Sequence, residues 1–416
     1  MGEGVSSPHE DFKYHPPNIP MNNTGYDFVL DKYFADFVNW ILANLNHCAD
    51  IQLYLNGDMF DFSSVALSGQ GITYPYETEA VQQIQIIREA HPLFFKALAK
   101  FCATDYTLKF FKGNHDWELN WPKVQNAIVK YISPNHPEKV HFLYEELNNG
   151  TYCRHGENEP NIKSDEQKPI ITCLDLTKLP AALKKAKFNF VLREILDVPL
   201  SYYMIGDLMR KLKPHNYLIG RMHTHGFVWL DAVKNIGRQS WHRSHWFSFA
   251  AVYYFLRTLF QYTLFSRFWH IKMKASPKKI LQLIWWTITG VLTGTTSRDS
   301  AMKVLRNQDE VDCVIHSHEH ECTLEVIQIN NKVKTYLNTG TWMVQFRDKT
   351  LEKVVPWKRL RDLQRFFKLA RDIFIKHELE VVWKCPVGLE TIDNDGKITR
   401  QLVEWDKEEK TLKQMS

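Results

Sequence analysis

Three short polar clusters follow apolar runs and carry residue types that bind divalent metals. Asp58 follows a glycine, Asn114 and His115 follow another glycine, and His318 and His320 are separated by one residue. Carboxylate, amide and imidazole groups suit manganese, iron, zinc or similar ions, whereas softer metals favour thiolates. A carboxylate such as Asp58 has two oxygens and can bridge two ions, and a pair of ions activates water for displacement at phosphorus. The clusters therefore predict metal-dependent hydrolysis of phosphoesters, with a phosphorylated compound as the substrate.

Each cluster is expected at the carboxyl end of a buried β-strand. The apolar runs at 51–55, 108–111 and 311–315 are bounded by polar turn residues and are short enough to be strands. Apolar residues repeat on one helical face over 30–41, and helix-forming residues dominate 77–100. Strands alternating with helices predict an α/β fold whose functional side chains gather at strand ends.

Four sequence blocks occur in an order typical of one superfamily. They are G-D-x-x-D at 57–61, G-N-H-D at 113–116, an isolated histidine at 155, and S-H-E-H at 317–320. The strand and turn at 337–342 resemble what often follows the last block. Together these blocks resemble the calcineurin-like metallophosphoesterases, although serine replaces the glycine with which that family's last block begins.

The resemblance implies an αββα sandwich of two mixed sheets flanked by helices, interrupted by a largely helical insertion. It also implies a centre of two divalent ions. The residues expected to bind metal are Asp58, Asn114, His155, His318 and His320, with Asp58 bridging the ions and His320 belonging to the second ion.

The same resemblance assigns roles to three further side chains beside the metals. His115 is expected to stabilise the transition state or to protonate the leaving oxygen. Asp116 is grouped with His115 as a catalytic candidate, and Asp116 and Asp61 are also expected to orient imidazoles or nearby backbone. Arg154, next to the isolated histidine, is expected to contact the substrate phosphate, and the alternative is a solvated surface arginine.

The family's opening D-x-H block has no counterpart before Asp58. Without that block the first ion would keep only Asp58 and His320, too few ligands for a stable site. We expect the block to be encoded upstream of Met1. The alternative is substitution by polar residues of the N-terminal segment, namely His9, Asp11 and His15.

Composition narrows the class of protein and its compartment. The chain has 416 residues, with 52 basic and 47 acidic side chains and a net charge of +5, a balance that does not indicate nucleic-acid binding. Seven cysteines without C-x-x-C spacing argue against a disulfide framework and for a reducing compartment, so we expect the protein to be cytoplasmic.

The spacing of the blocks divides the chain into a core with an insertion. The core is expected at 1–159 and 297–350, the insertion at 160–296, and a C-terminal helix with strands at 351–416. The insertion is rich in tryptophan and basic residues, with apolar stretches at 246–265 and 280–292. This composition predicts a helical cap over the metals, or alternatively an interfacial hairpin that makes peripheral membrane contact.

Two short motifs outside the four blocks have simpler interpretations. His223 and His225 imitate the last block, but they follow no clear strand and are expected to be surface or cap residues. The acidic segment 393–396 lacks the glutamate of a calcium loop and lies between apparent strands at 379–383 and 398–403, so we expect a hairpin turn.

Two alternative functions remain open at this level. One is a catalytically impaired homologue that binds a lipid or a protein partner through the aromatic insertion. The other resembles the UDP-diacylglucosamine pyrophosphatases, members of the same superfamily that act on a lipid-linked substrate, because the segment 155–157 has their histidine-glycine-acid order.

Overall fold

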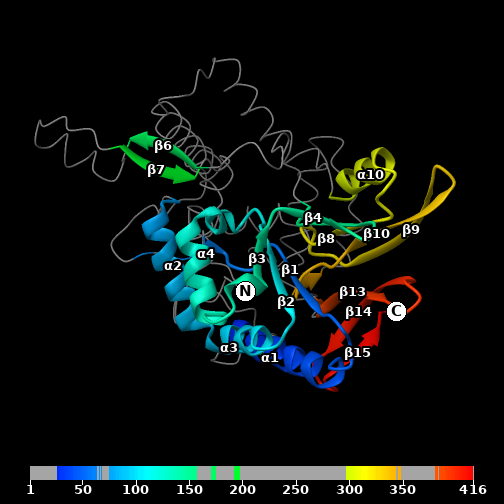
Figure 1. The fold of residues 1–416 in the computed structure, drawn as a ribbon, viewed down its shortest axis with the longest axis horizontal. Helices are drawn as coiled ribbons and strands as arrows, with labels where there is room; N and C mark the ends of the chain where they lie inside the picture. Colours follow the sequence, from blue (N-terminus) through cyan, green and yellow to red (C-terminus); the bar gives the residue numbers. More distant parts are fainter. Residues whose placement is uncertain are drawn as a thin grey trace, which may run out of the picture.

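A computed structural model defines the architecture around the predicted clusters. It describes residues 26–62, 65, 67, 75–156, 170–174, 192–196, 297–342, 345–347, 380–382 and 384–415. Within these residues the protein is a mixed α/β structure with several separate sheets, in agreement with the predicted class (Figure 1).

The first sheet is parallel and has helices packed against it. Its strands are ordered β1 (Gln52–Asn56), β2 (Thr107–Phe111) and β3 (Val140–Leu143). The helices beside it are α1 (Tyr26–Asn44), α2 (Glu77–Ala90), α3 (Pro92–Cys102) and α4 (Pro122–Ile132), with short 3-10 turns η4 (Trp117–Asn120) and η5 (Pro137–Lys139) (Figure 1). The predicted helical segment 77–100 is divided between α2 and α3 because Pro92 cannot continue a helix but suits a first turn.

The second sheet is mixed and brings distant parts of the chain together. Its order is β4 (Glu145–Asn148), β5 (Thr151–Arg154), β8 (Cys313–His316), β10 (Lys332–Asn338) and β9 (Thr323–Ile329). The three central strands are parallel, whereas β4 and β9 are antiparallel to their neighbours. Helix α10 (Ser297–Asn307) packs its buried Ala301, Met302 and Leu305 against this sheet.

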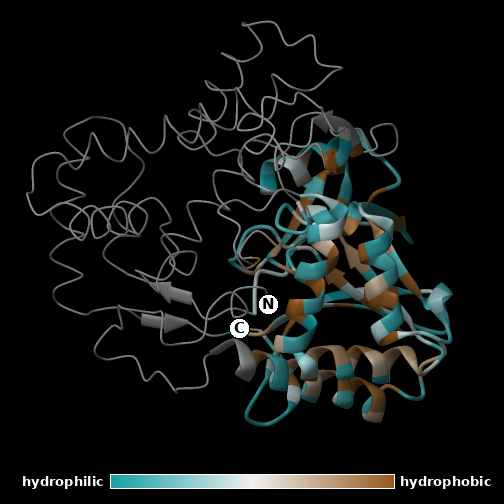
Figure 2. Cartoon of the chain, turned by 90° about the vertical axis from the view of Figure 1, so that its left-hand side faces the viewer, coloured by the Kyte–Doolittle hydropathy of each residue, from teal (hydrophilic) through white to brown (hydrophobic). Residues whose placement is uncertain are grey.

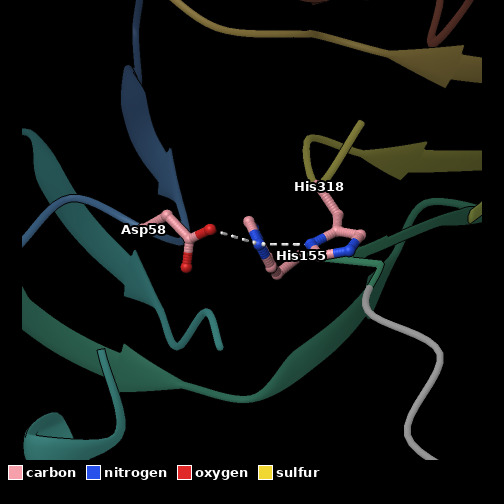
Figure 3. Close-up of side chains that lie close together, drawn as sticks. All are labelled: Asp58, His155 and His318. Carbon is pink, nitrogen blue, oxygen red and sulfur yellow. Dashed lines mark hydrogen bonds and ion pairs between the residues drawn. The ribbon is translucent and has the colours of Figure 1, made fainter. Parts of the chain in front are cut away.

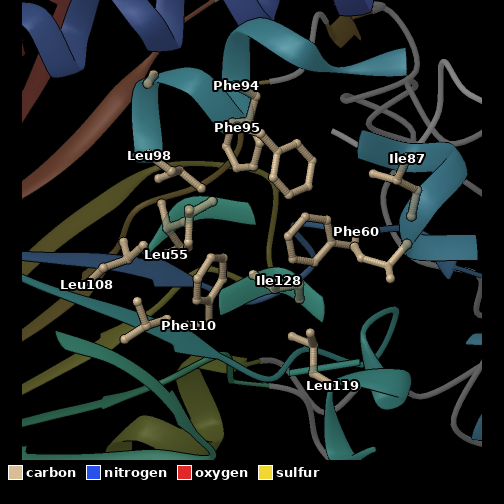
Figure 4. Packing of buried hydrophobic residues seen from close by; sticks show 14 of the residues in the cluster. Leu55, Phe60, Ile87, Phe94, Phe95, Leu98, Leu108, Phe110, Leu119 and Ile128 are labelled. Atoms are coloured by element: carbon tan, nitrogen blue, oxygen red, sulfur yellow. The ribbon is translucent and has the colours of Figure 1, made fainter. Parts of the chain in front are cut away.

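A large apolar core joins the first sheet to its helices. Phe60 and Phe110, both fully buried, lie among α2, α3 and α4 residues (Figure 4). The ring of Phe110 stacks on Phe142 at a centroid distance of 5.2 Å and on Phe60 at 5.8 Å. Figure 2 shows hydrophobic and hydrophilic residues alternating along the helices, as expected when each helix buries one face.

The C-terminal strands form a third sheet that packs on the core. Its strands are β13 (Pro386–Ile392), β14 (Ile398–Asp406) and β15 (Thr411–Gln414). Trp405 of β14 is buried with its ring 5.4 Å from Phe37 of α1.

The predicted hairpin turn at 393–396 is confirmed, because Gly396 has a left-handed φ of 77° and Asp393 Oδ1 accepts the backbone N–H groups of Asp395 and Lys397. The expected partner strand at 379–383 was wrong. That segment contributes β12 (Glu380–Val382), which pairs with β11 (Gln345–Arg347), while the turn joins β13 to β14.

Within the insertion, the residues that the structure describes are strands rather than helix. They are β6 (Ile170–Leu174) and β7 (Leu192–Leu196), an antiparallel pair. Arg193 fixes this pair of strands to the core. Its guanidinium donates to both carboxylate oxygens of Glu79, at 3.1 and 2.6 Å, and it lies 3.9 Å from the ring centroid of Tyr76. The apolar stretches 246–265 and 280–292 lie outside the described residues.

Membrane-spanning helices are not found in the described part of the chain, where every helix is too short or too polar to cross a bilayer.

Replacing Phe110 with alanine should lower the free energy of unfolding by about 3 to 5 kcal/mol, because it removes two ring contacts and leaves a cavity. Urea denaturation followed by circular dichroism measures the change. Leu93→Ala is the matched control, since Leu93 is 45% exposed and its loss should cost less than about 0.5 kcal/mol. Equal costs for the two variants would contradict the assigned core.

Candidate metal centre

The carboxyl ends of three strands meet at one point between the first and second sheets. Asp58 follows β1, His155 follows β5 and His318 follows β8. One ligand atom from each of these residues lies within 4.8 Å of the others, and Figure 3 shows the three side chains pointing toward one another. The sequence therefore predicted correctly that these distant residues come together.

A left-handed turn delivers Asp58 to this point. Gly57 has a φ of 81° and Asp58 a φ of 51°, a conformation that a non-glycine residue adopts at a cost. Two glycines also allow close approach: a Cβ on Gly57 would lie 2.2 Å from His155 Nδ1, and a Cβ on Gly113 would lie 2.2 Å from Asp58 Oδ1. Both glycines are thus required by close contact, and Gly57 is required by its backbone angle as well.

The ring nitrogen His155 Nε2 is the centre of the cluster. Asp58 Oδ2 lies 3.0 Å from it, and Asn114 Oδ1 and His318 Nδ1 each lie 3.2 Å from it. At most one hydrogen sits on Nε2, so a proton satisfies one of these contacts, whereas a divalent cation attracts the lone pairs of all four atoms.

The opposite edge of the His155 ring is held by the end of β1. Nδ1 lies 3.0 Å from the carbonyl oxygen of Asn56. A carbonyl only accepts, so Nδ1 carries the hydrogen in this contact. Metal-binding histidines commonly donate their second ring N–H to a backbone carbonyl in this way. The contact orients the ring and directs Nε2 into the cluster.

The charges of the cluster suit a cation. Burial would raise the pKa of the Asp58 carboxyl, but attraction to the imidazoles of His155 and His115 in their protonated forms outweighs burial and holds that pKa well below its usual range. Burial and the charge of His155 lower the pKa of His318 to about 3. Asp58 is therefore ionised and His318 neutral around pH 7, the protonation states that metal ligands need.

The spacing of the donor atoms fits a small divalent ion. Atoms bound about 2.1 Å from one ion stand about 3.0 Å apart at right angles and about 3.4 Å apart in a tetrahedron. The three separations from His155 Nε2 fall in or next to this interval. These three separations are compatible with one ion of the manganese, iron or zinc type bound among Asp58, Asn114, His155 and His318.

His115 stands beside the cluster as a partly exposed imidazole. Its backbone N–H donates to Asp58 Oδ1 at 2.9 Å, and its Nδ1 lies 3.2 Å from Asp61 Oδ1. Because a carboxylate accepts the hydrogen on Nδ1, the other ring nitrogen is the one left for proton transfer. Asp61 thus orients an imidazole, as the sequence predicted.

Asp116 is buried beneath the backbone segment that follows Asp58. Its carboxylate is fully buried and accepts the backbone N–H groups of Met59 and Phe60, both at 2.8 Å. Burial and the nearby charge of Asp58 raise its pKa to about 7. Asp116 therefore holds the loop after Asp58 in position, in agreement with the orienting role, whereas its catalytic role stays a prediction.

Arg154 is only partly exposed and contacts two residues, one in the second sheet and one directly before it. Its guanidinium donates to the hydroxyl of Tyr144 at 2.6 Å, lies 4.5 Å from the centre of the same ring, and approaches Glu145 at 4.0 Å. These contacts already engage the group expected to bind phosphate.

His320 lies outside the ligand group that the described residues form, although its charge contributes to lowering the pKa of His318. The loop around it is fixed by Asn338, whose side-chain amide donates to the carbonyls of Glu319 at 2.7 Å and Glu321 at 2.5 Å. The alternative ligands His9, Asp11 and His15, and the second histidine pair at 223–225, lie outside the described residues.

Sequence reasoning missed a set of contacts that joins the insertion to the cluster. The hydroxyl of Ser297, at the start of α10, donates to the carbonyl of Gly156 at 2.7 Å, and its backbone N–H donates to Glu319 Oε1 at 2.6 Å. The points where the chain leaves and re-enters the core are thus held together next to His155 and His318. No sequence motif marks Ser297, so only the structure could identify it.

In comparisons with known proteins, no protein-family model and no curated protein matches the chain.

Gly113→Ala should weaken binding of manganese or zinc at least about tenfold, because the new methyl group displaces Asp58 from the donor cluster. Isothermal titration calorimetry measures the affinity. Gly396→Ala is the control, since the methyl group added at Gly396 meets nothing within 4 Å. Undiminished affinity in Gly113→Ala would contradict the site.

Proposed function

We propose that this protein is a metal-dependent phosphoester hydrolase of the calcineurin-like type, acting on a phosphorylated substrate. The observation that carries the proposal is the convergence of Asp58, Asn114 and His318 on His155 Nε2, at 3.0 to 3.2 Å. These residues come from all four sequence blocks, and Asp58 and His318 are 260 positions apart in the chain. Their assembly agrees with the resemblance stated from the motifs alone.

The arrangement of the sheets supports a more specific proposal, that the α/β fold is an αββα sandwich. One sheet has helices α1 to α4 beside it and the other has α10, while the donor residues follow strands of both sheets (Figure 1). Polar contacts join the two sheets, since Lys109 of β2 donates to Glu146 of β4 at 2.6 Å. The proposal therefore places the two sheets as adjacent layers with helices on their outer faces.

The proposed chemistry assigns distinct tasks to the residues of the site. Two divalent ions, when bound, supply Lewis acidity and an activated water for in-line displacement at phosphorus. Asp58, Asn114, His155 and His318 would hold one ion, and His320 together with Asp58 would hold the other. His115, oriented by Asp61, would donate a proton to the leaving oxygen.

We also propose that the protein is located in the cytoplasm. All six cysteines whose side chains the structure describes are free thiols, which supports a reducing, cytoplasmic environment. Peripheral membrane contact through the insertion remains a prediction, because its aromatic stretches lie outside the described residues.

Asp58→Asn and His115→Ala should each abolish hydrolysis of nitrophenyl phosphoesters, since one removes a bridging carboxylate and the other the proton donor. The assay uses protein made with any in-frame codons that precede Met1. His136→Ala is the control for the imidazole, because His136 also pairs with a carboxylate, that of Glu138 at 3.3 Å, but on the surface. Full activity in either site variant would overturn the assignment.

The number of bound ions distinguishes the proposed hydrolase from a catalytically impaired homologue. The group of one carboxylate and two imidazoles among the described residues is compatible with either protein. Elemental analysis of purified, metal-loaded protein, made with any in-frame codons that precede Met1, should find about two ions per chain for the hydrolase. One ion or none, together with absent hydrolysis, would favour a binding protein instead.

A further inference from the structure

Asn338 is the last residue of β10, and its side chain is fully buried against the loop that carries the last sequence block. The amide nitrogen donates to the carbonyl oxygen of Glu319 at 2.7 Å and to that of Glu321 at 2.5 Å. These two carbonyls belong to the residues directly before and after His320. One side chain therefore holds the backbone on both sides of this histidine.

The chemistry of the contact requires an amide at position 338. Both partners are carbonyl oxygens, which only accept, and the amide NH₂ group supplies the two hydrogens that they need. The other amide atom, Asn338 Oδ1, is buried without a hydrogen-bond partner among the described residues, which costs free energy. Leucine has the same branched shape and would avoid that cost. What asparagine adds at this buried position is thus its pair of donors.

The loop has separate contacts at its start and in its middle. At its start, the backbone N–H groups of Ser317 and His318 both donate to the carbonyl of His155 at 2.9 Å. The middle segment, 319–322, lies after the end of β8 and before the start of β9. A Cβ on Gly340 would lie 2.9 Å from the carbonyl oxygen of His320, so the turn after β10 lies directly against this segment. Asn338 supplies hydrogen bonds to the segment at this point of close approach.

Lys334 makes the same kind of contact at the other end of β10. It lies four residues before Asn338, so the two side chains share one face of the strand, and both are fully buried. Its ammonium group donates to the carbonyls of Leu305 at 2.8 Å and Gln308 at 2.9 Å, at the end of α10. Lys334 is therefore a matched comparison, because it also binds two carbonyls but does so away from the last block.

We propose that Asn338 is a positioning residue that fixes the path of the chain through His318, Glu319 and His320, and thereby holds both histidines in place for metal binding. The inference rests on the proposed function for the task of the histidines, whereas the hydrogen bonds to the loop are independent of it. Loss of an outer contact that orients metal ligands weakens metal binding about 10- to 100-fold.

The first test measures hydrogen–deuterium exchange of the full chain without metal, by mass spectrometry. Asn338→Leu keeps the branched shape and removes both donors, so backbone amides in 317–323 should exchange at least about tenfold faster than in wild type. Lys334→Met should leave 317–323 at the wild-type rate and raise exchange near Gln308 instead. Unchanged exchange of 317–323 in Asn338→Leu, or equal acceleration in Lys334→Met, would overturn the proposal.

The β2 segment 107–111 is the internal reference for these variants, because it belongs to the other sheet. Its exchange should stay at the wild-type rate in Asn338→Leu. If exchange rises there as well, the variant has lost its global fold, and Asn338→Ala, which removes the donors and adds no bulk, gives the decisive comparison with Lys334→Met.

The second test measures zinc affinity of the same proteins by calorimetry. Asn338→Leu should bind zinc at least about tenfold more weakly than wild type, and Lys334→Met should stay within about threefold of wild type. Equal losses in the two variants would mean a general effect of reduced stability and would contradict the positioning role.

The two measurements separate failure of this inference from failure of the proposed function. If the wild-type protein binds no metal, the proposed hydrolase fails, while the exchange comparison still decides whether Asn338 holds the loop. If metal binds with the same affinity in Asn338→Leu as in wild type, the positioning role fails while the hydrolase proposal stands.

Discussion

The site depends on one crowded atom, the Nε2 nitrogen of His155. Three other donor atoms surround it at 3.0 to 3.2 Å, and a single proton cannot satisfy them all. Gathering lone pairs in this way costs free energy unless a cation lies among them. Three features hold these atoms together. They are the left-handed turn at Asp58, the close contacts that Gly57 and Gly113 allow, and the buried Asp116 carboxylate that binds the backbone after Asp58.

That convergence requires close contact between chain segments of different sheets. The end of β1 supplies Asn56, Gly57 and Asp58 in succession, and each of the three has a separate task. Asn56 orients the His155 ring, Gly57 leaves room for the ring, and Asp58 faces its other nitrogen. Asp116 then fixes the segment that follows, through the backbone of Met59 and Phe60. A small shift of β1 against β5 would therefore disturb all of these contacts together.

The sequence predicted the parts of this arrangement that depend on local pattern. Apolar runs marked β1, β2 and β8, and glycines marked the turns where donors approach closely. The prediction from sequence was wrong where tertiary contacts determine strand pairing. The strand before the 393–396 turn is β13, because β13 pairs Ile392 with Ile398 of β14. The sequence also could not identify Asn56 or Ser297, because backbone carbonyls and helix-end contacts leave no signature in residue type. The strands β6 and β7 were missed for a similar reason, since docking by Arg193 holds them on the core.

The most direct test of the central claim is X-ray absorption spectroscopy of the zinc-loaded full chain. We expect a first shell of nitrogen and oxygen alone, at about 2.0 to 2.2 Å, with the scattering pattern of two imidazoles. We also expect that one imidazole is lost in His318→Gln. A shell containing sulfur at about 2.3 Å, or one without imidazole, would contradict the assignment of His155 and His318 as ligands.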